Sequence, residues 1–536
     1  MNDKDVAERF SIGPDVRGAP VPAKPMSAQG WSHAVLALAI LLVALGLRLN
    51  DLGSESLWID EAISYARASY EPDKLVRDSL RRKHVPTYFL LLHYLMPALG
   101  DSEAALRLPS AVFGAGAAAV TYGIGALLSG PIAGLAAGLL VALAPSQIHY
   151  GQEARMYAMV TFFTAIGVLA IALLLSVPES RNALPFGPRL RQPKERTASM
   201  AWVLLLVGTV APLYLHNTAV FYVIGLQGAG ICLWLLSRGA RLRFARNWVL
   251  CQGLALLLWS PWIPHLLAQS DTFDRWKQSP FTWKLAADQL APIMLLDLEG
   301  LLPWLVAAAI MLAVVAPGRA RAHTWVLAAW PLFALVACAV VSFYKANMTF
   351  VRTLLWIAVP AFAIAGVGIA RLPHRLGLLT LLGLVFLIVP HVQEYYRADT
   401  KPPWREYIQL LVDRTNQSSV IVGTGANRFV HYYQQRRDAP LSARTVTHFN
   451  RQKRIEDVVG DAERFWWLAS TYSTKTKRFR KMVRKSRRYK RVFRRRRGAA
   501  VLSQYARKAH PARRPRARPT PDGSARPGAT QSSDRP

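Results

Sequence analysis

Long apolar segments recur through most of this sequence and constrain its fold more than any other feature. Each has near-membrane length, and together they cover residues 33–50, 105–128, 131–148, 154–177, 200–216, 219–237, 248–268, 299–317, 324–344, 353–371 and 376–391. About 20 apolar helical residues span a bilayer core, so the pattern predicts about 11 transmembrane helices. The composition agrees, because 52% of the 536 residues are hydrophobic. The predicted fold class is an α-helical polytopic membrane protein.

Basic residues in the connecting loops predict how these helices are oriented. Lys and Arg collect on the cytoplasmic side of membrane proteins. With the N-terminus inside, the inner loops are all basic; they are residues 178–199, 238–247, 318–323 and 371–375. Residues 1–32 are then a cytoplasmic leader, and residues 33–392 form a multi-pass domain of the cell (plasma or inner) membrane. The apolar segment 85–99 is short and contains two prolines, so we expect it to enter the outer leaflet and return.

The chain changes character after residue 392. Expected helices at 404–413 and 426–435 alternate with expected strands at 420–422 and 465–469, and a further helix and one or two strands follow. This order predicts a small α/β module at residues 393–507, outside the membrane. A glycine-containing turn at 423–428 lacks the third glycine of a dinucleotide-binding loop, so we interpret it as a plain strand-to-helix turn.

The C-terminal end of the chain is strongly basic. Residues 471–536 contain 23 Lys and Arg but only two Asp, which is a net charge of +21 out of +34 for the chain. Residues 508–536 have too little apolar surface to fold, so we expect a disordered basic tail. Because the topology places this tail outside the cytoplasmic membrane, its expected partners are anionic lipids or acidic envelope polymers, and no nucleic acid is expected.

An acidic pair, Asp60 and Glu61, follows the first apolar segment within Ser-Leu-Trp-Ile-Asp-Glu-Ala-Ile-Ser-Tyr at 56–65. Carboxylates beside a membrane are costly to desolvate and stay at the water boundary, where they serve as a general base or as metal ligands. The residues alone also allow a solvated loop acid. The topology gathers further polar residues on the same outer face: His84, Glu103, Arg107, Gln152, Glu153, Arg155, His216, Asn217, Asp271, Asp274, Lys345 and Arg352. Cations at helix ends alternatively extend to lipid headgroups.

Four motifs occur in a fixed order around this pair. They are Leu-Trp-Ile-Asp-Glu at 57–61, His-Val-Pro-Thr-Tyr at 84–88, Gly-Asp-Ser-Glu at 100–103 with Arg-Leu-Pro-Ser-Ala at 107–111, and His-Tyr-Gly-Gln-Glu-Ala-Arg-Met-Tyr at 149–157. Together they resemble the C-type membrane glycosyltransferases of the protein O-mannosyltransferase and aminoarabinose transferase group. The resemblance covers residues 31–175 most closely. It implies a GT-C fold that takes a sugar from a polyprenyl-phosphate donor on the outer face and transfers it, with inversion, to an envelope lipid, glycan or protein acceptor.

The chemistry of such a transfer assigns roles to the outer-face residues. Inversion needs a base that deprotonates the acceptor hydroxyl and cations that stabilise the leaving phosphate. Asp60 is the candidate base, and Glu61 supports it or helps to hold a divalent cation, which is the one cofactor that we consider. The candidates for binding donor phosphate and substrate are His84, Tyr88, Glu153, Arg155, Lys345 and Arg352. Arg107 and Glu103 are expected to form a structural pair.

A transporter or flippase of lipid-linked sugars is the alternative hypothesis. Transporters tend to show repeated halves and polar or broken helices near the middle of the bilayer. The sequence has no clear internal repeat, and its charged candidates lie at helix ends and in loops. These features favour an enzyme that works at the membrane interface, with the polyprenyl-phosphate sugar donor, membrane lipids and an envelope acceptor as its partners.

Overall fold

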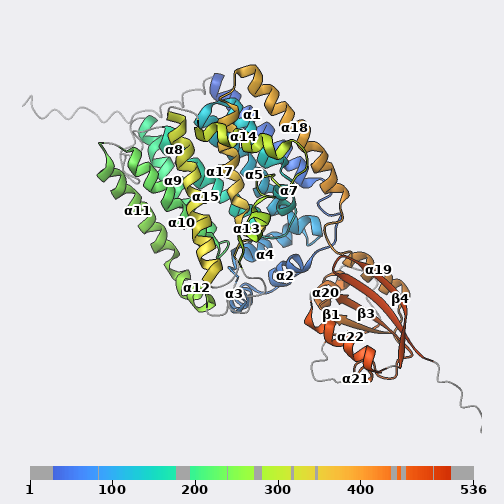
Figure 1. Ribbon diagram of the computed structural model, residues 1–536. Helices are drawn as coiled ribbons and strands as arrows, with labels where there is room; N and C mark the ends of the chain where they lie inside the picture. Colours follow the sequence, from blue (N-terminus) through green and yellow to red (C-terminus); the bar gives the residue numbers. More distant parts are fainter. Residues whose placement is uncertain are drawn as a thin grey trace, which may run out of the picture. The chain divides into compact units, whose positions relative to one another are not determined.

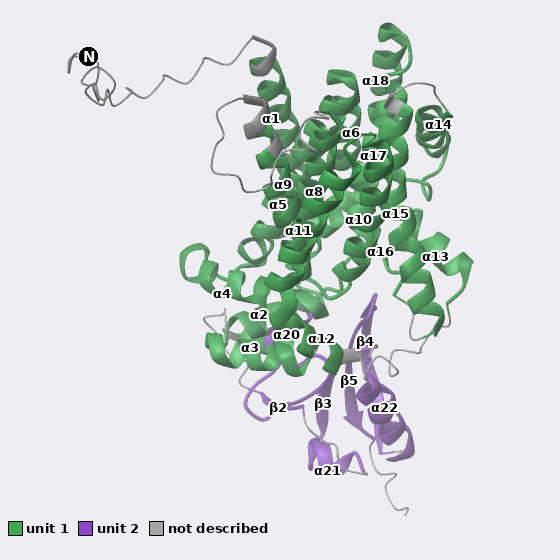
Figure 2. Cartoon of the chain, turned by 90° about the vertical axis from the view of Figure 1, so that its left-hand side faces the viewer, with its two compact units in different colours: residues 1–406, 428–436 green, residues 407–427, 437–536 purple. Residues whose placement is uncertain are grey.

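The computed structural model describes residues 28–82, 84–176, 193–237, 239–270, 281–315, 319–344, 348–435, 443–447, 454–471, 473–486 and 488–508. The chain forms two compact units (Figure 2). Unit 1 comprises residues 1–406 and 428–436, and unit 2 comprises residues 407–427 and 437–536. Each unit is described by itself below.

Unit 1 is built from helices throughout its described residues (Figure 1). The helices of its N-terminal half are α1 (Ala28–Leu49), α2 (Ile59–Ala68), α3 (Pro72–Arg81), α4 (Thr87–Leu99), α5 (Glu103–Ser129), α6 (Pro131–Leu143), α7 (Pro145–Gly151), α8 (Tyr157–Ser176) and α9 (Pro193–Leu213). There follow α10 (Ala219–Leu236), α11 (Arg241–Trp259), η3 (Ser260–Trp262), α12 (Ile263–Ser270), α13 (Trp283–Leu290), α14 (Leu302–Val315), α15 (Arg319–Tyr344), α16 (Val351–Leu354), η5 (Leu355–Ile357), α17 (Ala358–Ile369) and α18 (His374–Arg397). Helix α20 (Asn427–Gln435) adds residues 428–435 to this unit.

The apolar helices confirm that the chain is a polytopic α-helical membrane protein. Eight described helical stretches are long and apolar enough to cross a membrane, and α6 and α7 pass the same test as a pair bent by 59°. The expected spans at 200–216 and 299–317 coincide with two shorter apolar helices, Ser199–Leu213 and Leu302–Val315. Every expected span therefore corresponds to a helix or a helix pair, and the segment expected to enter and return forms the separate short helix α4.

Close helix packing forms the core of unit 1. Helix α5 packs against α1, α6 and α8, and α17 packs against α6 and α14. All residues of α17 from Ala358 to Ile369 are buried, so this helix lies inside the bundle. A Cβ atom on Gly125 would lie 2.5 Å from the backbone oxygen of Ala133. A larger residue at 125 would therefore force α5 and α6 apart, as is typical of small residues between membrane helices.

A buried arginine stabilises the break between α6 and α7. Carbonyl groups at the end of a helix lack partners within it, which is costly where water is absent. The Arg48 guanidinium, which is fully buried, donates to the carbonyl oxygens of Val141 and Ala142 at 3.3 Å each. Pro145 then occupies the first position of α7. The break thus fixes the direction of α7, which carries the His149 end of the fourth motif.

Unit 2 contains a five-stranded sheet in the order β2-β1-β3-β5-β4. The strands are β1 (Val420–Thr424), β2 (Arg444–Val446), β3 (Arg464–Ser470), β4 (Tyr489–Arg497) and β5 (Ala500–Arg507). Strand β1 pairs in parallel with β2 and β3, whereas β5 pairs antiparallel with β3 and β4. Helices α21 (Glu456–Val459) and α22 (Thr474–Ser486) share a core with one face of the sheet. The predicted α/β arrangement of the C-terminal module is confirmed.

The predicted start of the module at residue 393 stays a prediction, and the chain divides into its two compact units further on, after residue 406. Helix α18 continues to Arg397, and residues 398–406 belong to unit 1, as does most of α20. The reason is tertiary packing: the ring of Tyr432 stacks edge-on against Tyr65, and the backbone N–H of Leu57 donates to the Tyr433 hydroxyl at 2.9 Å. Helix α19 (Trp404–Arg414) runs from one unit into the other. The expected tail lies outside the described residues except for its first residue, Lys508, at which they end.

Candidate active site

The two adjacent carboxylates of helix α2, Asp60 and Glu61, lie in different surroundings. Glu61 is completely buried, and its oxygens accept from Arg107 at 2.7 and 2.9 Å and from the Lys401 Nζ at 3.3 Å. The backbone N–H groups of Trp58 and Ala154 also donate to it. Burial alone would raise the pKa of Glu61, but the charges of Arg107 and Lys401 together with these hydrogen bonds lower it to about 2. Glu61 is therefore an ionised structural anchor.

The expected pair between Arg107 and Glu103 does not form. Arg107 also donates to the carbonyl oxygens of Leu52 and Ser56, at 2.8 and 3.1 Å, so its donors hold Glu61 and the chain before α2 together. Glu103 accepts instead from Arg405 at 2.6 Å. A spacing of four residues brings two side chains onto one helix face, but the fully buried carboxylate of Glu61 has the greater need for a cation.

Asp60 remains accessible, in contrast to its neighbour. Its side chain is 23% exposed, and its Oδ2 atom lies 3.4 Å from the Nη1 atom of Arg352, which is 31% exposed. A carboxylate with an open side and, among the described residues, one long ion pair has the properties that a general base needs. The structure brings Asp60 and Arg352 together across 292 positions of sequence.

Arg155 provides a second cation beside Asp60. Its side chain is buried, its Nη1 atom lies 3.5 Å from the Ser64 hydroxyl, and its Nε atom has no hydrogen-bond partner in the described part of the chain. Burial alone would lower the pKa of Arg155, but Tyr157 and the charge of Asp60 raise it. A buried guanidinium with an unused donor is suited to bind an anionic ligand.

Two histidines near these arginines are neutral. Burial, followed by the charges of Arg155 and Arg67, lowers the pKa of His84 to about 2. Burial, followed by the charges of Arg155 and Arg352, lowers the pKa of His216 to about 3. At neutral pH both imidazoles therefore serve as hydrogen-bonding groups and not as cations. His84, a candidate for binding the donor phosphate, can therefore contact a phosphate through a hydrogen bond but not through a positive charge.

The remaining candidates occupy different positions. Tyr88 is fully buried and shares a 2.8 Å hydrogen bond with Ser110. The Ser110 hydroxyl also donates to the backbone oxygen of Arg155, so Tyr88 is linked to Arg155 through Ser110. Glu153 is buried, with one oxygen 3.1 Å from the His149 Nε2 and the other without a partner among the described residues. Lys345 lies outside the described residues.

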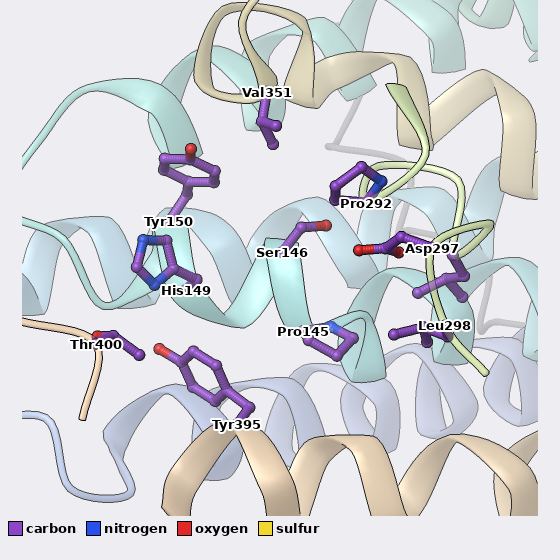
Figure 3. A pocket seen from close by; sticks show the side chains of 11 residues that line it. Pro145, Ser146, His149, Tyr150, Pro292, Asp297, Leu298, Val351, Tyr395 and Thr400 are labelled. Atoms are coloured by element: carbon purple, nitrogen blue, oxygen red, sulfur yellow. The ribbon is translucent and has the colours of Figure 1, made fainter. Parts of the chain in front are cut away.

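A pocket of about 290 Å³ lies in unit 1 (Figure 3). Val351, the neighbour of Arg352, lines it, together with Pro145, Ser146, His149, Tyr150, Pro292, Leu295, Asp297, Leu298, Tyr395 and Thr400. Figure 3 shows Ser146 and Asp297 directed toward one another across the pocket. The Ser146 hydroxyl is buried and has no partner in the described chain, and burial raises the pKa of Asp297. The pocket thus combines apolar walls with a few polar groups, as ligand sites do.

The described residues contain no cluster of three or more His, Cys, Asp or Glu side chains that could hold a metal ion. A divalent cation bound jointly by Asp60 and Glu61 would have to displace Arg107 and Lys401 from Glu61. The buried network opposes this exchange, because both cations would lose their partner inside the protein. Asp60 is the member of the pair that is open to a ligand.

Sequence reasoning missed three cations at this site. Lys401 is held by Glu61 and by the backbone oxygen of Gln152 at 3.0 Å. Arg67 pairs with Asp78 at 3.1 Å and covers the ring of Phe89. Arg428 of α20 is close enough to Asp60 and Asp78 for their charges to act on it. Lys401 and Arg428 follow the last span in sequence, and no local pattern signals that they return to α2.

Comparison with known proteins identifies the fold. No known protein family and no curated protein sequence matches this chain. Among solved structures, ArnT from Cupriavidus metallidurans in the apo state matches with a TM-score of 0.52 and 12% identity, over 88% of this chain and 98% of that chain. The same protein bound to undecaprenyl phosphate matches with a TM-score of 0.51 and 12% identity, over 89% and 98%. The chain is thus a multi-pass membrane protein with the GT-C fold. Its structure is similar to that of the aminoarabinose transferase ArnT, as the sequence motifs implied.

Proposed function

We propose that this chain is a membrane glycosyltransferase that moves a sugar from a polyprenyl-phosphate donor to an acceptor, with inversion at the anomeric carbon. The observation that carries the proposal is the position of Asp60: an accessible carboxylate 3.4 Å from Arg352 and within the electrostatic range of the buried Arg155. A base next to phosphate-binding cations is what this reaction requires.

The proposed reaction uses the residues in distinct roles. Asp60 accepts the proton of an acceptor hydroxyl, whose oxygen forms a bond to the anomeric carbon from the face opposite the phosphate. The bond between that carbon and the phosphate oxygen breaks, and the phosphate leaves with the electron pair. Arg352 and Arg155 stabilise the charge that develops on the phosphate. His84 and His216, both neutral, contribute hydrogen bonds only.

The pocket beside Val351 supports a binding role near this centre. Its volume of about 290 Å³ is in the range of a small ligand, and its polar groups, Ser146, His149 and Asp297, converge on a mostly apolar space. We assign it to the sugar or to the head of the lipid donor. The structure with undecaprenyl phosphate belongs to ArnT, and we extend that class of donor to this chain as part of the proposal.

The proposal also assigns the protein to a membrane and names the class of its acceptor. The basic inner loops favour the cell membrane, with Asp60 on the extracytoplasmic face. The acceptor is then an envelope lipid, glycan or protein, and the sugar is a hexose or a pentose. In this topology the α/β module at residues 393–507 and the basic tail at residues 508–536 lie outside the membrane.

The test compares Asp60→Asn with Asp73→Asn in the purified full-length protein. Asp73 lies on α3 with an 88% exposed side chain, so its variant loses a surface carboxylate that has no role in the proposed reaction. Loss of a general base costs about a hundredfold to ten-thousandfold in rate. We expect transfer from a polyprenyl-phosphate sugar to fall by this factor in Asp60→Asn, with unchanged donor affinity, and to persist in Asp73→Asn. Near-normal transfer by Asp60→Asn would remove Asp60 from the mechanism and favour the transporter hypothesis.

A further inference from the structure

The outer strand β4 of unit 2 concentrates positive charge at one edge of the sheet. Strand order places β4 last, paired only with β5 within the described residues. Residues 474–508, which include α22, β4 and β5, contain 17 Lys and Arg and no Asp or Glu. The edge of the sheet is therefore cationic along its whole length, with no acidic residue in these elements to neutralise it.

The register of β4 distributes its cations over both faces of the sheet. Partners in an antiparallel pair point to the same face. Arg491, Arg494 and Arg496 pair with Tyr505, Ser503 and Val501, whose face is covered by α22. Lys490, Arg495 and Arg497 pair with Ala506, Leu502 and Ala500 and point to the other face. All six of these basic side chains are exposed.

Side-chain contacts order several of these cations. On the α22 face, Arg491 and Arg494 lie near the Tyr505 hydroxyl together with Arg480 of α22. Phe479, Met482 and Val483 of α22 point into the core, which leaves Arg480 and Arg484 at the surface. On the other face, Arg495 lies over the ring of Tyr407 of α19 at 6.0 Å. These contacts position guanidinium groups along an extended strand.

We propose that β4 and α22 bind a linear phosphodiester polymer that carries no bases. Residues that share a face of a strand repeat at about 6.5–7 Å, a spacing that suits successive phosphodiester groups of an extended chain. Five of the six cations are arginines, whose planar fork matches phosphate oxygens in two places at once. The proposal concerns unit 2 and does not depend on glycosyl transfer.

The geometry favours a polymer over a membrane surface and over a nucleic acid. A flat bilayer meets one face of a protein, whereas β4 exposes cations on both faces, which a chain lying along the edge can contact together. Single-stranded nucleic acids bind to platforms of exposed aromatic rings. In the described part of unit 2 the only large apolar side chain that is exposed is Val492, an aliphatic residue.

The test measures binding of labelled poly(glycerol phosphate) to the full-length protein in zwitterionic nanodiscs, as a function of salt. One variant combines Arg491→Gln, Arg494→Gln and Arg496→Gln, and a second combines Lys490→Gln, Arg495→Gln and Arg497→Gln. A control variant removes three cations elsewhere, with Arg77→Gln, Arg444→Gln and Arg454→Gln, of which Arg444 lies in β2 at the opposite edge. Thermal unfolding confirms that each variant is folded.

We expect each β4 variant to weaken binding at least tenfold and to reduce the slope of log Kd against log salt by about 2, which is the loss of three phosphate contacts at about 0.7 each. The control should change both quantities much less. Equal losses in the control and the β4 variants would overturn the proposal, because net charge alone would then explain binding. Tighter binding of oligothymidine with the same number of phosphates would replace the proposed polymer with a nucleic acid. Tighter binding of phosphatidylglycerol vesicles, weakened by only one of the two β4 variants, would replace it with a membrane surface.

Discussion

The Nε atom of Arg107 lies 2.7 Å from the Oε1 atom of Glu61, and the two side chains are only 2% and 0% exposed. This ion pair joins α5 to the first turn of α2, where Asp60 precedes Glu61. Because Glu61 cannot move without leaving Arg107 and Lys401 unpaired, the pair also restricts where Asp60 can lie. The anchor and the candidate base thus come from adjacent residues with opposite environments.

The first prediction concerns this anchor. Glu61→Gln should lower the free energy of unfolding by about 3–5 kcal/mol, because Arg107 would keep its buried charge without a counter-charge. Thermal unfolding of the purified protein in detergent would measure the effect. The double change Glu61→Leu with Arg107→Met should recover part of the loss, since Lys401 would then be the one cation of this network that keeps its charge without Glu61. An unchanged melting temperature for Glu61→Gln would show that the pair contributes no net stability.

The second prediction concerns pH. His84 and His216 have pKa values of about 2 and 3 in the folded protein, below the 6.5 of an ordinary histidine. Between these values the unfolded chain binds more protons, so stability is complete above pH 6.5 and falls as the pH decreases below it. Each histidine should contribute a slope of up to about 1.4 kcal/mol per pH unit.

Unfolding measured from pH 7.5 to pH 5 separates these histidines from Glu61, whose pKa of about 2 makes it lose stability only below about pH 4.5. The combined variant His84→Asn and His216→Asn should flatten the dependence. A matched change at the exposed His374, at the start of α18, should leave it as it is. The same pH slope in the double variant and the unmodified protein would contradict this assignment.

The third prediction concerns donor binding. Arg155→Ala should weaken the affinity for polyprenyl phosphate about tenfold or more, since a charged hydrogen bond contributes about 1.5–3 kcal/mol. Transfer should fall too, because the contact exists in both the ground state and the transition state. Arg77→Ala, which changes a largely exposed side chain on α3, serves as the control. Unchanged lipid affinity in Arg155→Ala would place the phosphate elsewhere.

The fourth prediction concerns topology. In a variant without the native Cys232, Cys251 and Cys338, a cysteine introduced at Arg189 should be protected from impermeant reagents added to intact cells. A cysteine at Arg454 in unit 2 should react. The reason is the basic inner loop at 178–199, which places the two positions on opposite sides of the membrane. Labelling of position 189 from outside the cell would contradict the predicted arrangement of eleven spans.

The sequence by itself determined the membrane helices and the secondary structure of the module. Burial in a bilayer depends on runs of about 20 apolar residues, which are a local property of the chain. The alternation of expected strands and helices after residue 404 is equally local, and it matches β1, α20 and β3. The sequence also indicated that the motif around Asp60 belongs to a candidate site, because this motif and three others occur in an order that resembles a known group of enzymes.

Only the tertiary structure decided how deeply each polar residue of the candidate site is buried and what it contacts. Asp60 and Glu61 are adjacent in sequence, and packing alone makes one accessible and the other buried. The partners of Glu61 lie 46 and 340 positions away, at Arg107 and Lys401. Ion-pair choice depends on which charges are desolvated together, and desolvation is set by the whole fold. For the same reason, no local pattern could show that Lys401 and α20 return to α2 after the last span.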